Sequence, residues 1–288
     1  MSQYTDSPMI IKNPPISARH FRPNHPPSVR QGCVSVYAEL HHYSLIAYKI
    51  PAERAKAIVP DSFQVEETVQ DGRHETWLSV VSVLDQGSQR DGHGVFEQTS
   101  YRLHVLRNGN PAHFLLGISL GSLSAVAIRN LWPVPWHLSA MEFQVAYDQT
   151  EGRYRGHRLQ TQSQWDNASW EISDTGELVL PHQIQQLELP SSLSANALNN
   201  YFLRRDGSLG LLRVRYYDLA WTWGRLEHAQ SDLLERLGLL TNDELTRPAL
   251  VAIQHKVTCQ IFSPTILGDV QVESHKFEPE RRRLPFAS

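Results

Sequence analysis

The segment Trp132-Pro133-Val134-Pro135-Trp136-His137-Leu138 places two tryptophans, two prolines and a histidine in one short stretch. Proline fixes φ and removes an amide donor, so the segment is predicted to be neither the interior of a helix nor a central strand. A rigid backbone that carries large aromatic rings and a titratable imidazole is typical of a pocket wall or of a buried corner. The segment alone leaves both interpretations open.

The sequence Gly117-Ile118-Ser119-Leu120-Gly121 matches the G-x-S-x-G nucleophile elbow, whose serine attacks acyl groups from a turn between a strand and a helix. The expected strand before it and helix after it fit the motif. The rest of the chain does not, because hydrolases of that fold need alternating βαβ units and this chain predicts hairpins. The plainer interpretation is that small residues let the strand end and the helix start pack closely.

Histidine is abundant, with 14 residues, which raises the question of a metal site. His41 and His42 are neighbours on an expected strand, so they should point to opposite faces and at most one should face any given site. His104 and His113 are expected on paired strands that bring them close together. The sequence has no H-x-x-x-H or carboxylate spacing of the zinc kind, so we predict no metal ligand.

Tyr217, Trp221 and Trp223 are predicted to share one face of a strand. Such a row is by default part of a core, and the alternative is an apolar wall for a small ligand.

Composition indicates a soluble globular protein with 41% hydrophobic and 20% charged residues. A net charge of -3 argues against a nucleic-acid or anionic-membrane partner. Two cysteines, Cys33 and Cys259, are too few for a disulfide scaffold, and neither a membrane span nor a signal-peptide core is evident. We therefore predict a cytoplasmic protein.

The alternation of short strands with few helices predicts an α+β fold, mainly antiparallel β, built as a curved sheet or barrel. A proline-rich arm is expected over residues 1–32, a single domain over 33–270 and a tail over 271–288. Strands are predicted at residues 33–49, 75–84, 99–106, 113–120, 142–147, 153–160, 169–172, 209–223 and 251–261, with a hairpin turn at Asn108-Gly109-Asn110. Helices are predicted at residues 51–59, 122–131, 194–203, 231–239 and 243–245.

Three blocks of sequence, in this order, resemble the acetoacetate decarboxylase-like superfamily. ELHHYSLIAYKIPAERAKAIVPDSFQV (39–65) is similar to its first strand, helix and VP turn, and GHGVFEQ (92–98) to the turn with its active-site glutamate. AIRNLWPVPWHL (127–138) is similar to the segment with its Schiff-base lysine, while NNYFLRRDG and WTWGRLEH look more like decarboxylase-like relatives. The resemblance covers residues 35–270 and implies the curved sheet or barrel of that family and assembly into a homo-oligomer.

In that family a lysine forms an imine with a β-keto acid, and the imine accepts the electrons released with CO2. The match puts the imine lysine on Trp136, its neighbouring lysine on His137, and the carboxylate-binding arginine on His41. The family's glutamate falls on Gln98, with Glu97 beside it, and Arg129 is kept. Tryptophan cannot form an imine, so lysine chemistry is not expected through this site. The chain has only five lysines to replace it, namely Lys12, Lys49, Lys56, Lys256 and Lys276.

The resemblance thus predicts a family pocket with a new lining. His137, His41 and Gln98 are the candidate catalytic residues, and Trp136, Arg129, Glu97, His104 and Trp132 the candidate substrate-binding residues. Histidines of this kind can move protons near neutral pH and stabilise an enolate without covalent attachment. We therefore expect an enzyme, of lyase or isomerase type, that acts on a hydrophobic carbonyl compound and needs no cofactor. The alternatives are a binding protein for an apolar metabolite and a serine hydrolase that uses Ser119.

Overall fold

The computed structural model describes residues 35–85, 96–122, 134–179, 183, 189–194, 197–204, 206–217 and 220–269. All of these belong to one compact unit, Val34–Ser288. The predicted arm, the predicted tail and nearly all of the predicted helix at 122–131 lie outside the described residues, so these predictions stay open.

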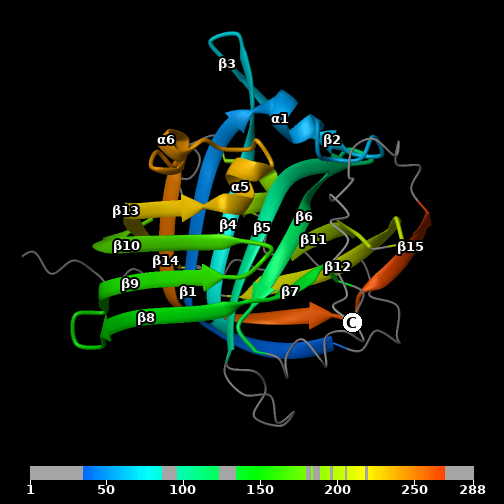
Figure 1. Cartoon of the computed structure of the whole chain (residues 1–288). Coiled ribbons are helices and arrows are strands. Elements are labelled where there is room, and N and C mark those ends of the chain that lie inside the picture. The colour runs from blue at the N-terminus through cyan, green and yellow to red at the C-terminus, as the bar shows by residue number, and fades with distance from the viewer. Residues whose placement is uncertain are drawn as a thin grey trace, which may run out of the picture. The chain divides into compact units, whose positions relative to one another are not determined.

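Within the described residues, strands dominate and join into a single sheet (Figure 1). The strands are β1 (Ser35–Pro51), β2 (Gln64–Val65), β3 (Glu67–Gln70), β4 (Arg73–Asp85), β5 (Phe96–Arg107), β6 (Asn110–Leu120), β7 (Trp136–Leu138), β8 (Ala140–Asp148), β9 (Arg153–Gln162), β10 (Asn167–Leu178), β11 (Ala197–Leu203), β12 (Ser208–Tyr217), β13 (Thr222–Ser231), β14 (Leu250–Phe262) and β15 (Thr265–Asp269). The helices are short: α1 (Ala52–Lys56), α4 (Ser191–Ser194), α5 (Asp232–Arg236) and α6 (Asn242–Leu245). The predicted α+β class with mainly antiparallel strands is confirmed.

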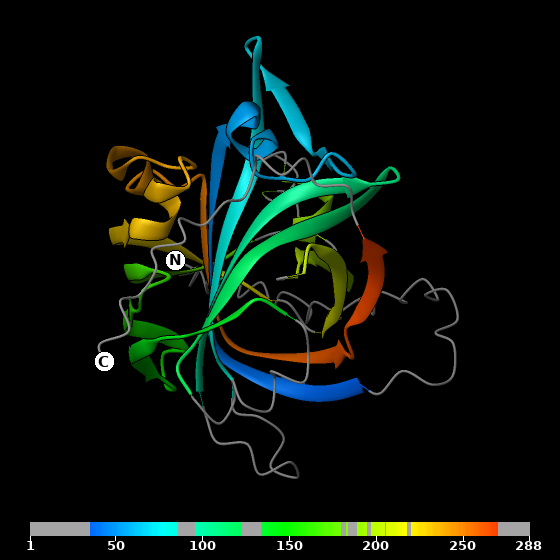
Figure 2. The ribbon, with the colours of Figure 1, turned by 45° about the vertical axis from the view of Figure 1, so that its right-hand side comes forward.

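The sheet closes on itself and then continues as a second layer. Strands β12, β11, β6, β5, β4, β1 and β14 follow one another, and an additional pairing of β12 with β14 completes a barrel. The path runs on from β14 through β13, β10 and β9 to β8, and these four strands pack over the outside of the barrel (Figures 1 and 2). Most pairs are antiparallel, but β6 pairs in parallel with β7 and β11.

This arrangement buries both faces along much of β1, β4, β5 and β6, because one face lines the barrel and the other meets the outer core. In β1, Leu45 and Ala47 join the inner core inside the barrel. Ile46 and Tyr48, which alternate with them, join the outer core between barrel and second layer. The inner core also contains Trp77, Phe202 and Trp221, and the outer core Tyr101, Leu159 and Trp170.

The predicted hairpin of β5 and β6 is confirmed. Its turn residues Asn108 and Gly109 both have positive φ, 51° and 74°, as the tight turns that suit twisted hairpins require. Strand register in the hairpin pairs His104 directly with His113, as expected.

The helix predicted at residues 194–203 is wrong. The Ser-Ser pair after Pro190 starts only the one-turn helix α4, and the chain then forms β11. Leu198 and Phe202 point with Asn200 into the barrel, a period of two that a strand requires. Pairing of β11 with β6 and β12 therefore outweighed the local helix signal.

The single strand predicted at residues 209–223 is also wrong, because the stretch contains all but the first residue of β12 and the first two residues of β13. Trp221 and Trp223 both contact the inner core, as the core interpretation predicted. Tyr217 belongs to β12 instead, where its hydroxyl donates to Gln260 Oε1 at 3.1 Å.

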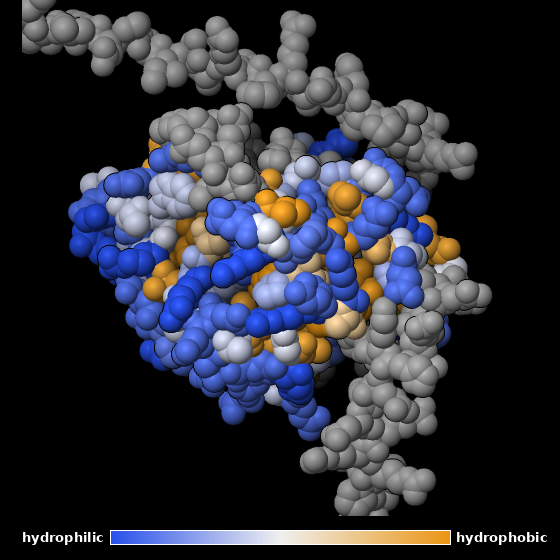
Figure 3. All heavy atoms as spheres, turned by 90° about the horizontal axis from the view of Figure 1, so that it is seen from above, coloured by the Kyte–Doolittle hydropathy of each residue, from blue (hydrophilic) through white to orange (hydrophobic). Residues whose placement is uncertain are grey.

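Seen from above, hydrophilic residues dominate the described surface, with smaller hydrophobic areas between them (Figure 3). None of the helices in the described ranges is long and apolar enough to cross a membrane.

Candidate functional site

A cavity of about 50 Å³ lies inside the barrel, and we call it the barrel cavity. Its volume exceeds the roughly 10–15 Å³ that a cavity needs to hold a water molecule, so a small ligand or water can enter it. One half of the lining is apolar and the other half is polar or charged, a combination typical of small-molecule sites. The lining residues are Leu40, Leu115, Trp136, Leu212, Val214 and Ile261, with Asp85, Gln98, Arg102, Asn200, Tyr216 and Cys259.

Strand periodicity positions the polar residues. Gln98 and Arg102 are four residues apart on β5, so they point to the same face, toward the barrel interior. Asp85 ends the neighbouring strand β4, where it pairs with Phe96. Asn200 reaches the cavity from β11, and its amide is held by the carbonyl of Leu212 at 3.2 Å.

Arg102 is the dominant charge at the cavity. Its side chain is buried, with 7% exposure, and Nε donates to the hydroxyl of Ser100 at 3.1 Å. Burial lowers the pKa of Arg102, but the phenols of Tyr216 and Tyr43 outweigh this and raise it above its ordinary value. No carboxylate of the described residues forms an ion pair with Arg102. A buried cation without such a partner is costly, and an anionic ligand would offset that cost.

Two tyrosines flank this guanidinium. The rings of Tyr43 and Tyr216 lie 6.1 Å apart in an edge-to-face arrangement inside the barrel. Burial raises the pKa of Tyr43 well above its usual range, so this phenol is a neutral donor at pH 7. The two phenols therefore act on Arg102 as polar neutral groups, and they do not neutralise its positive charge.

The structure brings two of the predicted site residues together at this cavity, Trp136 and Gln98. Trp136 opens the short strand β7 directly after Pro135 and pairs with Ile118 of β6. Glu97 alternates with Gln98, and its carboxylate lies next to Gly121, outside the cavity lining.

His137 is not brought to the cavity. It follows Trp136 on β7, so its ring points to the opposite face, where it stacks on Trp165 at 4.1 Å with nearly parallel planes. Trp165 packs against the outer core, which places His137 between barrel and second layer.

His41 also lies elsewhere, in a cluster with His42 and His255. The ring centroids are 6.1 Å apart for His41 and His42, 5.8 Å for His41 and His255, and 5.4 Å for His42 and His255. The expectation that His41 and His42 serve opposite faces is wrong, because a β-bulge follows His41 and His42 takes a φ of 51°. His41 Nε2 lies 2.6 Å from the carboxylate of Glu39.

This cluster predicts that stability falls in acid. Burial, together with the nearby His255, His157 and His41, lowers the pKa of His42 to about 4. The unfolded chain therefore binds more protons than the folded one between pH 6.5 and about 4. The contribution of His42 to the free energy of unfolding is fully present above pH 6.5 and is lost as the pH falls through that window. One such group costs at most ~1.4 kcal/mol per pH unit, and because His42 is half-exposed we expect a total of about 1–2 kcal/mol.

Urea unfolding across this pH range measures the decline. His42→Asn removes the titrating ring, and asparagine tolerates the positive φ, so the variant should show a shallower loss of stability toward acid. The exposed His228→Asn is the matched control and should follow the wild type. Equal pH slopes for the wild type and His42→Asn would contradict this interpretation.

His104 lies inside the barrel but one layer away from the cavity. Its ring is fully buried, with Nδ1 2.6 Å from Ser192 Oγ and Nε2 3.1 Å from Ser79 Oγ. The His113 ring is 4.6 Å away and hydrogen-bonds to Asn200 at 3.3 Å. Burial, aided by His113 and Arg102, lowers the pKa of His104 well below its usual range. Burial also lowers the pKa of His113. Both rings are therefore neutral at pH 7, and His113 holds the side chain of Asn200 in place.

The predicted binding residues Arg129 and Trp132 lie outside the described residues. Ser119 is described, and it occupies a position within β6, where it is fully buried and pairs with Thr99. A nucleophile elbow instead presents its serine at an exposed turn. Its setting therefore does not favour hydrolase chemistry.

The described lysines all bond away from the barrel cavity. Lys49 Nζ donates to Gln70 at 3.2 Å, Lys56 pairs with Glu67 at 2.6 Å, and Lys256 pairs with Glu39. None of the three lines the cavity.

Sequence reasoning missed Arg102, Asp85, Asn200 and Tyr216 as site residues. The signal for Arg102 was present, since it lies on a predicted strand at an even spacing from Gln98. Its neighbours Tyr101 and Leu103 already supply an apolar face to the strand, so the alternation by itself did not indicate that Arg102 is buried. The strand is in fact buried on both sides.

A model of the DUF2071 family, described as an uncharacterized conserved protein, matches residues 37–258. The chain belongs to this family. The match includes every described residue of the barrel cavity lining except Ile261 and Cys259. A comparison with curated protein sequences found no match.

Solved structures place this DUF2071 member in a known fold. An acetoacetate decarboxylase from Legionella pneumophila is 12% identical, with a TM-score of 0.51 over 86% of this chain and 94% of the other. A second acetoacetate decarboxylase is 13% identical, with a TM-score of 0.51 over 82% and 91%. The enduracididine biosynthesis enzyme MppR, complexed with a condensation product of pyruvate and imidazole 4-carboxaldehyde, is 11% identical, with a TM-score of 0.50 over 81% and 90%. The predicted likeness to the acetoacetate decarboxylase-like superfamily is confirmed at the level of the fold.

Proposed function

We propose that this protein is an enzyme that acts on a small carbonyl compound with an anionic group, by acid/base catalysis inside the barrel cavity. The observation that carries the proposal is the buried guanidinium of Arg102, which faces the cavity without an ion-pair partner among the described residues. Arginine binds carboxylates and enolates through charge-assisted hydrogen bonds, which are strong in a dry site.

The chemical step that fits this lining is enolate formation. Asp85 is the carboxylate among the described lining residues, so it is the candidate base that takes a proton from the carbon next to the carbonyl. The electrons of the broken C–H bond form a C=C bond, and the carbonyl electrons move to oxygen, where Arg102 stabilises the negative charge. Gln98 offers an amide to orient the substrate, and Trp136 forms an apolar wall.

This assignment moves the acid/base role away from His137 and His41, which lie on other faces of the sheet. An enolate is an intermediate common to isomerisation, cyclisation, elimination and lysine-independent decarboxylation. The proposal therefore specifies enolate formation and leaves these four reactions as alternatives. The cavity volume favours a compact ligand.

Exchange of substrate protons with solvent tests the proposal. The protein is mixed in D2O with compact 2-oxo and 3-oxo acids and with their methyl esters, and NMR follows loss of the signal of the proton next to the carbonyl. We expect exchange for an acid and not for its ester. Asp85→Asn should abolish exchange while thermal shift still reports binding, and Glu171→Gln, an exposed carboxylate on β10, should change neither.

Two outcomes would separate this proposal from its rivals. Binding of the acid without any exchange would favour a non-catalytic carrier of the same ligand. Trapping of a stable adduct by borohydride would show an imine on a lysine, and non-covalent catalysis would then be refuted.

A further inference from the structure

Strand β8 forms an open edge of the sheet. It ends the strand path and pairs with β9 on one side, and no other strand of the described residues pairs with its free side. An edge of this length presents a row of backbone donors and acceptors that can add another strand.

The edge lacks the usual protection against such pairing. Natural edge strands often carry lysine or proline, and the sequence AMEFQVAYD of β8 contains neither. Its charges are Glu142 and Asp148, and Asp148 is already bound by Arg155 of β9 at 2.7 Å. Glu142 is therefore the charge of β8 that a partner strand would have to accommodate.

The inward face of β8 is incompletely covered. Met141, Phe143, Val145 and Tyr147 all pack against the outer core, yet each is only half-buried. One more strand beside β8 would cover the remaining apolar surface of this row.

The sequence of β8 suits an antiparallel copy of itself. A two-fold axis at Gln144 opposes Phe143 with Val145, an aromatic–β-branched pair of the kind that stabilises sheets. It also opposes Glu142 with Ala146, so no like charges meet. The outer pairs in this register are Met141 with Tyr147 and Ala140 with Asp148.

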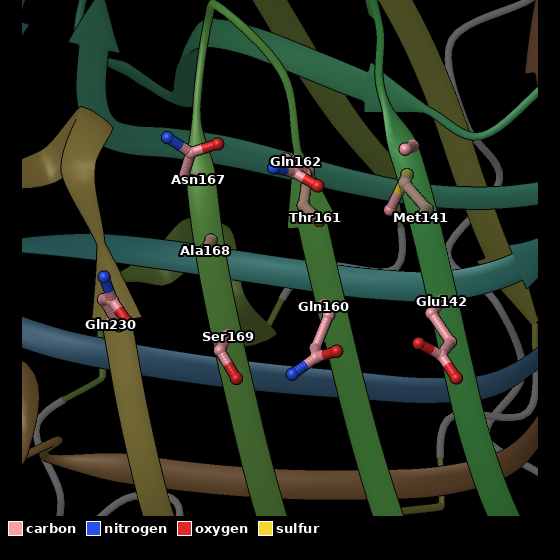
Figure 4. Close-up of a pocket in the computed structure, with 10 residues that line it drawn as sticks. Met141, Glu142, Gln160, Thr161, Gln162, Asn167, Ala168, Ser169 and Gln230 are labelled. Carbon is pink, nitrogen blue, oxygen red and sulfur yellow. The ribbon is translucent and has the colours of Figure 1, made fainter.

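The outer face of the second layer is consistent with a continued sheet. Glu142, Gln160, Ser169 and Gln230 lie side by side on β8, β9, β10 and β13, along an open depression of about 390 Å³ (Figure 4). This polar row ends at β8, where Glu142 would face Ala146 of the second copy, a small residue that leaves room for the carboxylate.

We propose that two copies of this chain pair through β8, antiparallel and centred on Gln144, to form a symmetric dimer with a continuous second layer. Isologous pairing of this kind uses the same surface on both subunits. The proposal is independent of the chemistry in the barrel cavity.

A cysteine at the axis tests the register. Residues opposite each other in an antiparallel pair have Cβ atoms roughly 4.5–5.5 Å apart, close enough for a disulfide after small adjustment. In a Cys33→Ser background, Gln144→Cys should form a disulfide-linked dimer of twice 32.8 kDa under mild oxidation. Gln230→Cys, exposed on the same face but on β13, should stay unlinked.

A second variant tests the interface without new covalent bonds. Gln144→Lys places two like charges at the axis and should weaken the dimer at least tenfold in sedimentation equilibrium, while the unfolding midpoint measured on the monomer stays unchanged. A wild type that is monomeric at every concentration would overturn the proposal. A dimer that neither variant affects would overturn it equally, because it would use another surface.

Discussion

Replacing Arg102 with methionine is expected to abolish binding of carboxylate ligands and to leave the fold at least as stable as before. Loss of a buried, charge-assisted contact costs about 2–5 kcal/mol of binding free energy, which corresponds to roughly 30-fold or more in Kd. The fold behaves differently, because a buried charge without an ion-pair partner opposes folding. An apolar residue of similar volume is often neutral or stabilising by ~1–4 kcal/mol.

Calorimetric titration with the acids that bind the wild type measures the first effect, and urea unfolding measures the second. Arg102→Lys keeps the charge but loses the planar donor fork, so an intermediate affinity is expected. Arg158→Met, an exposed site on β9, is the matched control and should change neither quantity. A methionine variant that unfolds would show that Arg102 serves the fold, and one that still binds the acids would show that Arg102 does not hold the ligand.

Replacing Asp166 with alanine should destabilise the protein by about 3–5 kcal/mol, because it removes the acceptor from a buried junction. Asp166 is 1% exposed and lies between β9 and β10. One carboxylate oxygen accepts from the Tyr101 hydroxyl, and the other from Leu233 N at 3.0 Å and the Ser231 hydroxyl at 3.3 Å. These contacts join β5 of the barrel to the start of α5 in the second layer.

Denaturant unfolding measures this loss. Asp166→Asn keeps the shape and one acceptor oxygen, so it should cost less than alanine. Asp243→Ala, at an exposed position of α6, should stay within about 1 kcal/mol of the wild type. A loss below ~1 kcal/mol for Asp166→Ala would mean that water replaces the carboxylate and that the junction is not tightly closed.

Local sequence patterns predicted most of the strands because side-chain alternation is a property of the strand itself. The β5–β6 hairpin followed from its turn residues, whose positive φ values the turn requires. The patterns did not reveal β11 as a strand or the break between β12 and β13. These features depend on strands far along the chain: β11 pairs with β6, β12 with β14, and β13 with β10.

Only part of the candidate site was predicted from the sequence, because the rest depends on contacts between distant strands. Trp136 and Gln98 were found through the family resemblance, and both line the barrel cavity. His41 was assigned to the site by the family match, but its neighbour Leu40 lines the cavity and the ring of His41 lies with His42 and His255. Arg102 was missed because a sequence does not show that both faces of a strand are buried.

The sequence by itself determined the fold class, the hairpin and the absence of a lysine at Trp136, since each depends on residue type and local spacing. Only the tertiary structure decided which of those residues share a site. Closure of the barrel through β12 and β14 buries Arg102 in the lining of the same cavity as Asp85 and Gln98, and strand alternation turns His137 and His41 to the other face of the barrel strands. The physical reason is that burial and the neighbours of a charge arise from strand pairings between residues far apart in the chain, and these pairings set what its chemistry can be.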